Sequence, residues 1–247
     1  MSGPDNFLAP KSIESLARVV AEFADEIYLS LTTIGTALRD LWNDLTDERR
    51  PAVRSADLAS LREMIVAELG VRGELFDGTG VIMADGVLAD RPLFLEWWLS
   101  DAVRGPQRHM LELNPQSEYF YDYTLLDWYV IPRDRRRRWV EGPRIDFACS
   151  DQYVCTFTIP VESVPGEFLG VAGADVPVAA MEKALLPAFR ASNPRATLVN
   201  SEGRVILGVD PEFPPGSRIG RGDRSDGVPV DALPWSLLPQ RGSARRS

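Results

Sequence analysis

The chain has 247 residues, of which 45% are hydrophobic and 26% are charged, so it can form one large folded domain or two small ones. Its 36 acidic and 27 basic residues give a net charge of -9, which argues against direct binding of nucleic acid. No run approaches the roughly 20 apolar residues that cross a bilayer, and the first residues lack a secretory signal, so we expect a cytoplasmic protein without a membrane partner.

A long amphipathic helix is predicted between Ser12 and Pro51, with the first as N-cap and the second as stop. Its apolar residues recur every three or four positions: Ile13, Leu16, Val20, Phe23, Ile27, Leu31, Ile34, Leu38, Leu41 and Leu45. At 1.5 Å per residue such a helix would be roughly 55 Å long. Because the spacing is close to a heptad repeat, the stripe could pack on its own domain or against a second copy in a homodimer.

A second helix is predicted from Ser55 to Leu69, with Gly70 as its C-cap. From Gly78 the pattern changes to strands and turns, beginning with the short apolar run GTGVIMADG. The segment DQYVCTFTIPV alternates two sets of side chains and predicts a half-buried strand. It forms an antiparallel hairpin with FLGVAGADV through a Pro-Gly turn.

The C-terminal third contains a short helix, a hairpin and a tail. We expect Pro187 to kink or end the helix in VPVAAMEKALLPAF. The segment ATLVNSEGRVILGV predicts a hairpin that turns at Ser201 to Gly203. From residue 221 onward Gly, Ser, Pro and Arg dominate, and we interpret residues 221–247 as a disordered tail.

One histidine and two cysteines restrict the chemistry that the chain can perform. With His109 as the single imidazole, two-histidine metal sites and HExxH helices are excluded. No GxSxG nucleophile motif is present, and we interpret His109 as an exposed loop residue. Cys149 and Cys155 are expected to stay free thiols. We therefore expect neither an enzyme nor a bound metal or cofactor.

The region 94–147 is rich in aromatic residues. They include Trp97, Trp98, Tyr119, Phe120, Tyr121, Tyr123, Trp128 and Tyr129. Rings with hydroxyl and indole donors commonly build small-molecule pockets, although clustered rings also form ordinary core. Neighbouring carboxylates could complete a cation site or act as caps and surface charges. The acidic residues concerned are Glu96, Asp122, Asp127, Asp146 and Asp175.

The order of these segments resembles the double-Cache family of sensory domains. The likeness rests on the long helix, the Trp-Tyr pair, the GPxxD turn, the strand YVCTFTIPV, the segment FLGVAGADV and the later ATLVNSEGRVI. It implies an α+β fold in which two PAS-like subdomains, built on antiparallel sheets, follow a long N-terminal helix. We divide the chain into the helix at 11–50, a ligand-binding Cache subdomain at 51–176, and a second, smaller PAS-like subdomain at 177–220.

Amino-acid sensors of this family share a motif of ligand-binding residues. By resemblance, Tyr121 fits its first position, Trp128 and Tyr129 fit its Trp-Tyr pair, and Asp175 fits its final aspartate. The resemblance implies that Asp175 accepts hydrogen bonds from a ligand ammonium group while the Trp-Tyr pair contacts the ligand. Trp98, Asp146 and Tyr153 complete our set of candidate ligand-binding residues, together with Arg144.

Two positions depart from the family motif. Leu126 stands where the motif has an arginine that binds a carboxylate, and Arg144 stands where it has a later tyrosine. Without the guanidinium, bidentate recognition of a carboxylate is lost at that position. An amine-type ligand is therefore our first hypothesis. In the alternative, Arg144 supplies a relocated carboxylate clamp and the ligand is an amino acid or another acid; Arg144 could also be a surface turn residue.

Residues 133–138 contain five arginines, which we interpret as a solvated loop and not as a phosphate-binding patch. Our leading hypothesis for the whole chain is a small-molecule sensor. Its output would be supplied by a partner, for which a separate transcriptional regulator is our guess. An enzyme that uses carboxylates and tyrosines, and a pure interaction protein built on the long helix, are the alternatives.

Overall fold

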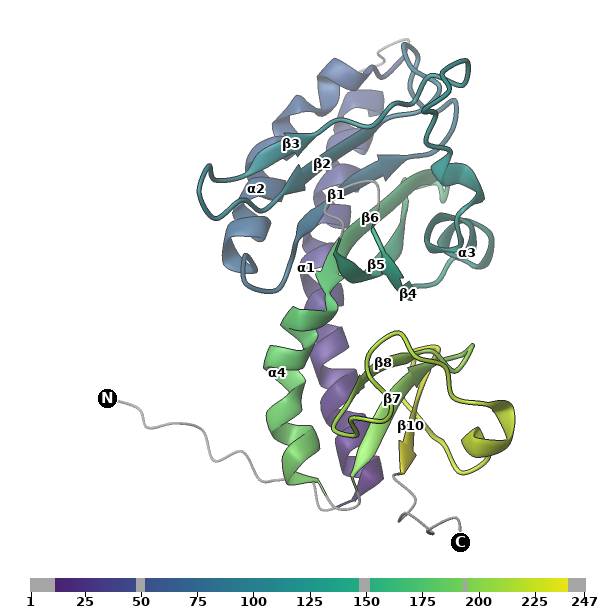
Figure 1. The fold of residues 1–247 in the computed structure, drawn as a ribbon. Helices are drawn as coiled ribbons and strands as arrows, with labels where there is room; N and C mark the ends of the chain where they lie inside the picture. Colours follow the sequence, from purple (N-terminus) through teal and green to yellow (C-terminus); the bar gives the residue numbers. More distant parts are fainter. Residues whose placement is uncertain (1–11, 48–51, 147–151, 193–194, 240–247) are drawn as a thin grey trace, which may run out of the picture. The chain divides into compact units, whose positions relative to one another are not determined.

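The computed structural model describes residues 12–47, 52–146, 152–192 and 195–239. It divides into a larger unit, residues 25–180, and a smaller unit, residues 1–24 and 181–247. Each unit contains an antiparallel sheet, so the predicted α+β class with a long N-terminal helix is confirmed (Figure 1).

Helix α1, Ile13–Asp47, begins as the sequence predicts. The backbone N–H of Ser15 donates to Oγ of Ser12 at 3.2 Å, which satisfies one of the free donors of the first turn. Most of the predicted apolar stripe is buried within the chain, and Phe23 and Leu41 are half-buried. A homodimer through α1 stays a prediction, and it would need the other face of the helix, where Leu29 is 65% exposed.

The sheet of the larger unit has the strand order β3-β2-β1-β6-β5-β4, and every neighbouring pair is antiparallel. Its strands are β1 Gly78–Met83, β2 Leu95–Leu99, β3 Gln107–His109, β4 Trp139–Ile145, β5 Tyr153–Glu162 and β6 Phe168–Pro177. The predicted hairpin of β5 and β6 is confirmed. The predicted turn at Gly142–Pro143 is wrong, because both residues lie inside β4 at a register shift between Glu141 and Arg144.

The predicted second helix is two elements. Residues Ser55–Ser60 form the 3₁₀ helix η1, and α2 runs from Leu61 to Val71, beyond the predicted cap. The first turn of η1 is held by a residue that is distant in sequence, since Asp90 accepts from both the backbone N–H and the hydroxyl of Ser55 at 2.8 and 2.7 Å. Short 3₁₀ segments of this kind are frequent at the N-termini of α-helices.

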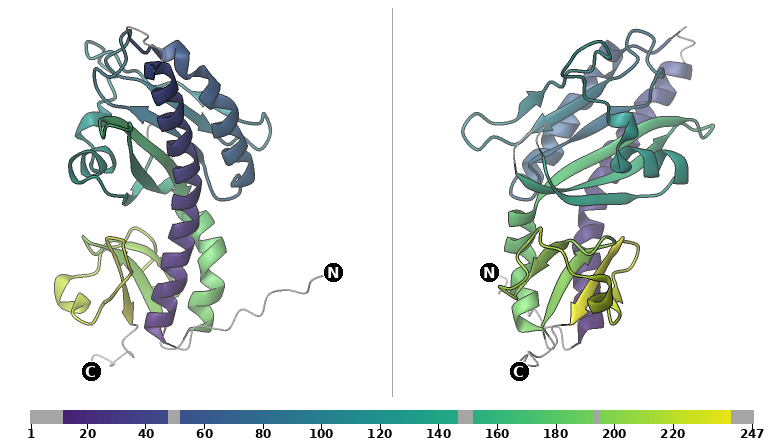
Figure 2. Two further views of the ribbon diagram at one scale, coloured as in Figure 1. Left: turned by 180° about the vertical axis from the view of Figure 1, so that it is seen from behind. Right: turned by 45° about the vertical axis from the view of Figure 1, so that its right-hand side comes forward.

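The two faces of this sheet are covered by different elements. Helices α1 and α2 lie on one face, and α3, Asp127–Arg135, lies on the other (Figures 1 and 2). The 3₁₀ helix η2, Tyr123–Leu125, precedes α3. Apolar side chains fill the space below α1 and α2, whereas the face below α3 carries a cluster rich in aromatic rings. A sheet covered on both faces has buried side chains at successive positions.

Strand β5 shows this double burial. The prediction of a half-buried strand is wrong, because Thr156 and Thr158 on one face are buried as well as Cys155 and Phe157 on the other. The ring of Phe157 meets that of Tyr28 edge-on, with centroids 5.5 Å apart. Cys155 is a free thiol, and Cys149 lies outside the described residues.

The arginine run is only in part the solvated loop that the sequence predicts, because Arg135, Arg136 and Arg137 are exposed whereas Arg133 and Arg138 are half-buried. It forms the last turn of α3, a left-handed residue at Arg136 (φ 49°), and the approach to β4. Four of its guanidinium groups lie over aromatic rings; Arg138, for example, is 4.5 Å from the ring centroid of Tyr28. Arg138 also forms an ion pair with Asp25 at 2.7 Å. Most guanidinium groups of the run therefore already make contacts within the chain.

The smaller unit contains a four-stranded antiparallel sheet in the order β8-β7-β10-β9. Its elements are α4 Val178–Ala191, which begins in the larger unit, β7 Ala196–Asn200, β8 Val205–Gly208, η3 Arg221–Arg224, β9 Val228–Pro229 and β10 Trp235–Pro239. The predicted hairpin around Ser201 to Gly203 is confirmed. Helix α4 continues for one turn beyond Pro187, so the expectation that this proline could end the helix is wrong.

The prediction of disorder from residue 221 is wrong for residues 221–239. Strand β10 lies between β7 and β9 in the sheet, and Trp235 is 1% exposed. The apolar run WSLL follows a stretch rich in Gly, Ser and Arg, whose composition hides it. The smaller subdomain therefore extends beyond the predicted boundary at residue 220, and residues 240–247 lie outside the described part.

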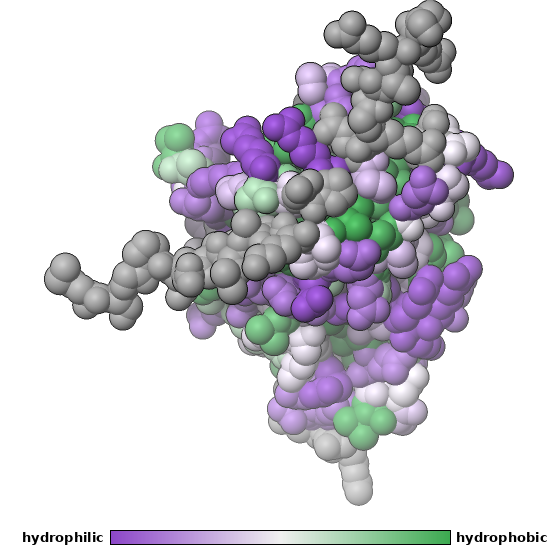
Figure 3. Space-filling model, turned by 90° about the horizontal axis from the view of Figure 1, so that it is seen from below, coloured by the Kyte–Doolittle hydropathy of each residue, from purple (hydrophilic) through white to green (hydrophobic). Residues whose placement is uncertain are grey.

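Among the described residues, no helix combines the length and apolar character needed to cross a membrane. Hydrophilic residues cover most of the described surface in the view of Figure 3, with hydrophobic residues scattered among them. Single exposed apolar residues of this kind are ordinary on protein surfaces.

Candidate ligand-binding site

A pocket lies on the α3-covered face of the larger unit's sheet, with a cavity of about 40 Å³. One water needs roughly 10–15 Å³ of such space, so the cavity suits a small guest. Its lining comprises Ile82, Leu95, Trp97, His109, Leu111, Tyr121, Tyr123, Trp128, Arg144, Asp146, Thr156, Thr158 and Asp175. The charged side chains come from β6 and from the β4 region, and the apolar ones come mainly from β1, β2 and the segment after β3.

Glycines on the central strands make room for the indole of Trp97. A Cβ on Gly78 would lie 2.5 Å from Nε1 of Trp97, and a Cβ on Gly173 would lie 3.5 Å from Cη2 of the same ring. The indole therefore spans from β1 to β6 across positions where any other residue would project a side chain. The sequences GTG and AGAD thus place one flat ring along the floor of the pocket.

Arg144 reaches the pocket because β4 is irregular. The register of β4 against β5 shifts between Glu141 and Arg144, and such bulges redirect side chains near binding sites. The guanidinium donates from Nη2 to Oγ1 of Thr156 at 3.1 Å and lies 3.9 Å from Oδ1 of Asp146. Burial opposes its charge, but Asp175 and other neighbours outweigh this effect and raise the pKa of Arg144. The hypothesis that Arg144 is a surface turn residue is wrong.

Asp175 is buried at the polar end of the pocket. It is 5% exposed, and its Oδ1 accepts a hydrogen bond of 2.6 Å from Oγ1 of Thr156. Burial, followed by the charge of Asp146, raises the pKa of Asp175 to about 7, although the hydrogen bond from Thr156 and the charge of Arg144 act in the opposite direction. Near neutral pH this carboxyl group exchanges readily between its charged and neutral forms.

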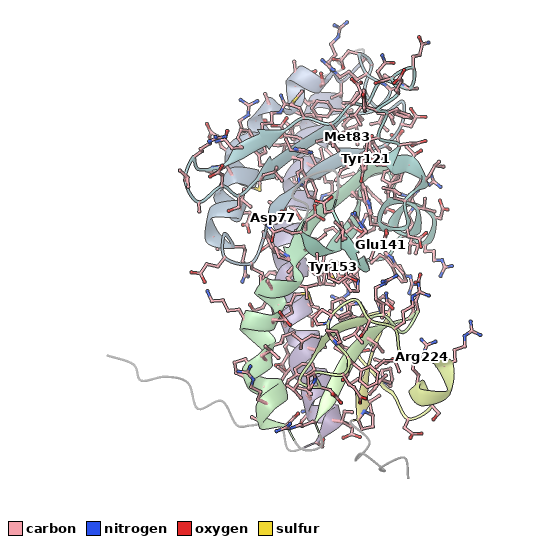
Figure 4. The ribbon with its side chains drawn as sticks, viewed as in Figure 1. Asp77, Met83, Tyr121, Glu141, Tyr153 and Arg224 are labelled. Carbon is pink, nitrogen blue, oxygen red and sulfur yellow. The ribbon has the colours of Figure 1, made fainter. Side chains whose placement is uncertain are left out.

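The aromatic wall is fixed by hydrogen bonds. Trp128 is 5% exposed; its backbone N–H donates to Glu141 at 2.8 Å, and its carbonyl accepts from Oγ1 of Thr158 at 2.7 Å. The hydroxyl of Tyr123 donates to the carbonyl of Met83 at 2.8 Å. Figure 4 labels Tyr121, Glu141 and Met83 in this part of the larger unit. A wall held in this way offers a preformed surface to a ligand.

The structure brings together five of the eight residues that the sequence proposes as ligand contacts. Tyr121, Trp128, Arg144, Asp146 and Asp175 all line the pocket. Contact of these residues with a ligand stays a prediction.

The other three proposed contacts lie outside the pocket lining. Trp98 faces α2, where its Nε1 donates to Glu96 at 2.9 Å and the guanidinium of Arg62 lies over its ring. Tyr129 follows Trp128 on α3 and packs in the aromatic cluster, 5.9 Å from Phe168 between ring centroids. Tyr153 is half-buried at the start of β5.

Sequence reasoning missed several residues that line the pocket. The sequence places Trp97 and Tyr123 only in an aromatic region, and the buried Thr156 and Thr158 only in a strand, whereas all four line the pocket. The interpretation of His109 as an exposed loop residue is wrong, because it is half-buried on β3 and lines the pocket. The alternation along β5 could have indicated that both threonines face a polar site, because polar side chains on a covered face of a sheet usually meet a polar partner.

The pocket combines one guanidinium, two carboxylates, hydroxyl groups and indole N–H groups within an aromatic enclosure. Such a set can bind and orient a small charged molecule. Among the described residues, no three His, Cys, Asp or Glu side chains form a group that could hold a metal ion.

No protein-family model matches the chain, and no curated protein sequence does. Solved structures do match. A structure described as methyl-accepting chemotaxis protein X has a TM-score of 0.61 and 16% identity, and the match covers 92% of this chain and 96% of that one.

Two ligand-bound chemoreceptor domains are also similar. The ligand-binding domain of Campylobacter jejuni chemoreceptor Tlp3, in complex with 4-methylisoleucine, has a TM-score of 0.59 and 13% identity, covering 85% of this chain and 71% of that one. The domain of the Pseudomonas aeruginosa PAO1 amino acid chemoreceptor PctC, in complex with GABA, has a TM-score of 0.56 and 14% identity, covering 90% and 92%. At these identities the likeness shows the fold, and the predicted Cache-type fold is confirmed.

Proposed function

We propose that this chain is a sensory protein that binds a small metabolite with an ammonium group in the pocket of its larger unit. One observation carries the proposal: the buried carboxyl group of Asp175 lines the same small pocket as the ring of Trp128. A buried carboxylate beside an aromatic face is a favourable environment for an organic cation. The fold shared with chemoreceptor ligand-binding domains supports a sensory role over an enzymatic one.

The charge balance of the pocket supports an ammonium group. Asp146 and Asp175 supply two carboxylates, whereas Arg144 supplies one guanidinium that is already close to both Thr156 and Asp146. The raised pKa of Asp175 means that the residues around it compensate the charge of its carboxylate only in part. An ammonium group bound beside Asp175 would supply the missing positive charge.

A second candidate is a ligand that also carries a carboxylate, such as an amino acid. The observation that favours it is the position of Arg144, whose side chain reaches the pocket through the bulge of β4. Arginine can bind carboxylates in a bidentate manner, although here its Nη2 already donates to Thr156. The two candidates share the ammonium contact at Asp175 and differ at the other end of the ligand.

Thermal-shift measurements with three matched compounds test both candidates. Isobutylamine carries only the ammonium group, isovalerate only the carboxylate, and L-valine both; the full sets of amino acids and biogenic amines extend the screen. We expect stabilisation by compounds with an ammonium group, because ligands that bind the native state raise its stability. If no compound of the screen stabilises the protein, the proposed function is wrong. Turnover of a stabilising compound would favour an enzyme instead.

The variant Asp175→Asn tests the assignment of the ammonium contact. It keeps the size of the side chain and removes its charge, so we expect affinity for the best ammonium compound to fall roughly 10- to 100-fold, as for a lost charge-assisted hydrogen bond. Asp134→Asn is the matched control, since Asp134 is exposed on α3 and pairs with its neighbour Arg133. Equal binding by Asp175→Asn and the parent would overturn the site assignment.

We further propose that ligand binding changes contacts with a partner protein, for which a transcriptional regulator is our guess, in the cytoplasm. A ligand can shift a conformational equilibrium only through different affinities for the two states. Hydrogen exchange of α1 and α4 with and without a stabilising compound tests this step. Unchanged exchange in both helices would contradict signalling through them.

A further inference from the structure

Two buried indole N–H groups in the pocket have no hydrogen-bond partner among the described residues. They belong to Trp97, which is 6% exposed, and Trp128, which is 5% exposed. Both residues line the pocket. An indole N–H is a donor only, so a single acceptor satisfies it.

The position of the Trp97 N–H is fixed by the strands beneath it. Its Nε1 lies over Gly78, because a Cβ there would be only 2.5 Å away. Gly78 is the register partner of Asp175 in the pairing of β1 with β6. Directly paired residues present their side chains on the same face of a sheet. The N–H of Trp97 and the carboxyl group of Asp175 therefore belong to neighbouring positions of one pocket floor.

The neighbouring Trp98 shows what a satisfied indole looks like in the same strand. Its Nε1 donates to Oε1 of Glu96 at 2.9 Å on the opposite face of the sheet. Leaving a buried donor without a partner costs about 1–3 kcal/mol, so buried donors are rarely left in this state without a role. The same strand thus holds one indole N–H with a hydrogen-bond partner and one without a partner among the described residues.

We propose that Trp97 determines ligand specificity, by donating its indole N–H, together with that of Trp128, to an acceptor oxygen of the ligand. The ligand class follows: a small molecule in which the ammonium group beside Asp175 is accompanied by a carboxyl or carboxamide oxygen. This inference rests on the proposed function and deepens it. The two indole donors come from the floor and the wall of the pocket. Leu126, which stands at the position of the family's arginine, does not line the pocket.

Calorimetric titration of a conservative variant tests the role of Trp97. Trp97→Phe keeps an aromatic ring and removes the donor, and Trp98→Phe is the matched control on the other face. The probes are the 20 proteinogenic amino acids and, for the tightest of them, its amide and its decarboxylated amine. We expect Trp97→Phe to lower the affinity for the amino acid and for the amide about tenfold or more, and to leave the affinity for the amine unchanged. Trp98→Phe should change none of the three affinities.

The outcomes separate this inference from the proposed function. If the parent binds amines but no amino acid or amide, or if Trp97→Phe weakens the amine as much as the amino acid, the inference is wrong and the proposed function stands. If Trp97→Phe binds the amino acid as the parent does, the inference is also wrong. If the parent binds none of these compounds, the proposed function fails and the inference fails with it.

A spectroscopic measurement on the unaltered protein covers the case in which Trp97→Phe does not fold. The chain has six tryptophans, so its ¹⁵N-labelled form gives six indole N–H signals. The signal of Trp97 is assigned by elimination from single Trp→Phe variants at the other five positions. Addition of the tightest amino acid should shift the signals of Trp97 and Trp128 downfield and leave that of Trp98 in place. An unmoved Trp97 signal at saturation would overturn the inference.

Discussion

The two faces of the six-stranded sheet are built from alternate residues of the same strands, yet they carry different types of side chain. On β6, Ala172 packs into the apolar layer below α1 and α2, whereas Gly173 and Asp175 belong to the pocket floor. On β2, Trp98 faces α2 and Trp97 faces the pocket. One face gives stability through close apolar packing, and the other replaces apolar residues with glycine, threonine and aspartate. The period of two along a strand lets one segment encode both.

The largest effect on stability is expected on the face of the sheet that α1 and α2 cover. Phe157→Ala removes a fully buried ring that packs against Tyr28, and we expect it to lower the free energy of unfolding by about 3–5 kcal/mol. Urea denaturation measures the change. Thr158→Val, at the next position but on the pocket face, removes only the hydrogen bond to Trp128 and should cost less. A larger loss for Thr158→Val would contradict the division of roles between the faces.

An intermediate effect is expected from Gly78→Ala on the pocket face. The added methyl group would meet Nε1 of Trp97 at 2.5 Å and Cδ2 of Leu99 at 2.8 Å, so the indole must move. Overpacking of this kind typically costs about 1–3 kcal/mol. We expect reduced stability together with lost amino-acid binding, measured by denaturation and by titration. Gly86→Ala is a poor control because its φ is +72°, whereas Gly70, with no atom within 4 Å of an added Cβ, is a suitable one.

Ligand binding on the pocket face should depend on pH. With a pKa of about 7, Asp175 is mostly protonated at pH 6 and mostly charged at pH 8, so an ammonium compound should bind about tenfold more weakly at pH 6. The charged groups that influence Asp175 are Asp146, Arg144 and Asp77. Titration of the best ammonium compound at both pH values measures the change. A tighter complex at pH 6 would contradict the ammonium contact.

The same carboxyl group affects the stability of the free protein. Its pKa in the folded state, about 7, lies above the ordinary value of 3.8, so the native state binds this proton more tightly than the unfolded state. Its contribution to stability is therefore greatest below about pH 4 and declines as the pH rises through 7. Asp175→Asn should remove this component of the pH dependence. Thr156→Val deletes a hydrogen bond that lowers the pKa, and it should move the midpoint of binding to higher pH.

The smallest effect is expected at the arginine run. Arg137 is exposed and lies 5.1 Å above the ring centroid of Trp139, a contact worth about 0.5–1 kcal/mol at an exposed site. Arg137→Ala should therefore lower the free energy of unfolding by less than about 1 kcal/mol and leave ligand binding unchanged. A marked loss of binding would connect this run to the pocket.

The sequence could predict elements whose pattern is local. The stripe of α1, the β5–β6 hairpin and the pocket positions of Trp128 and Asp175 follow from periodicity and from the family resemblance. It could not distinguish Trp97 from Trp98, because alternation fixes that two neighbours face opposite ways but not which of them faces the site. The direction becomes clear only when β2 is paired with β1 and the space above Gly78 is seen.

Other errors arise where tertiary structure outweighs local composition. His109 lies in a polar run, yet it is half-buried because β3 pairs with β2 and brings it opposite Trp97. Strand β10 follows a segment typical of disorder, yet its apolar residues are buried in the smaller unit's sheet. In both cases burial depends on pairing with another strand, about which the composition of the segment itself gives no information.

Strand β6 and helix α4 follow each other without a connecting loop, since Pro177 ends one and Val178 begins the other. Asp175 is therefore three residues from the first turn of α4. Because β6 is paired on both sides, by β1 and β5, it cannot slip in register without breaking two ladders of hydrogen bonds. Any displacement of Asp175 would consequently have to involve β1 and β5 as well, and the first residue of α4 follows only three positions further along the chain.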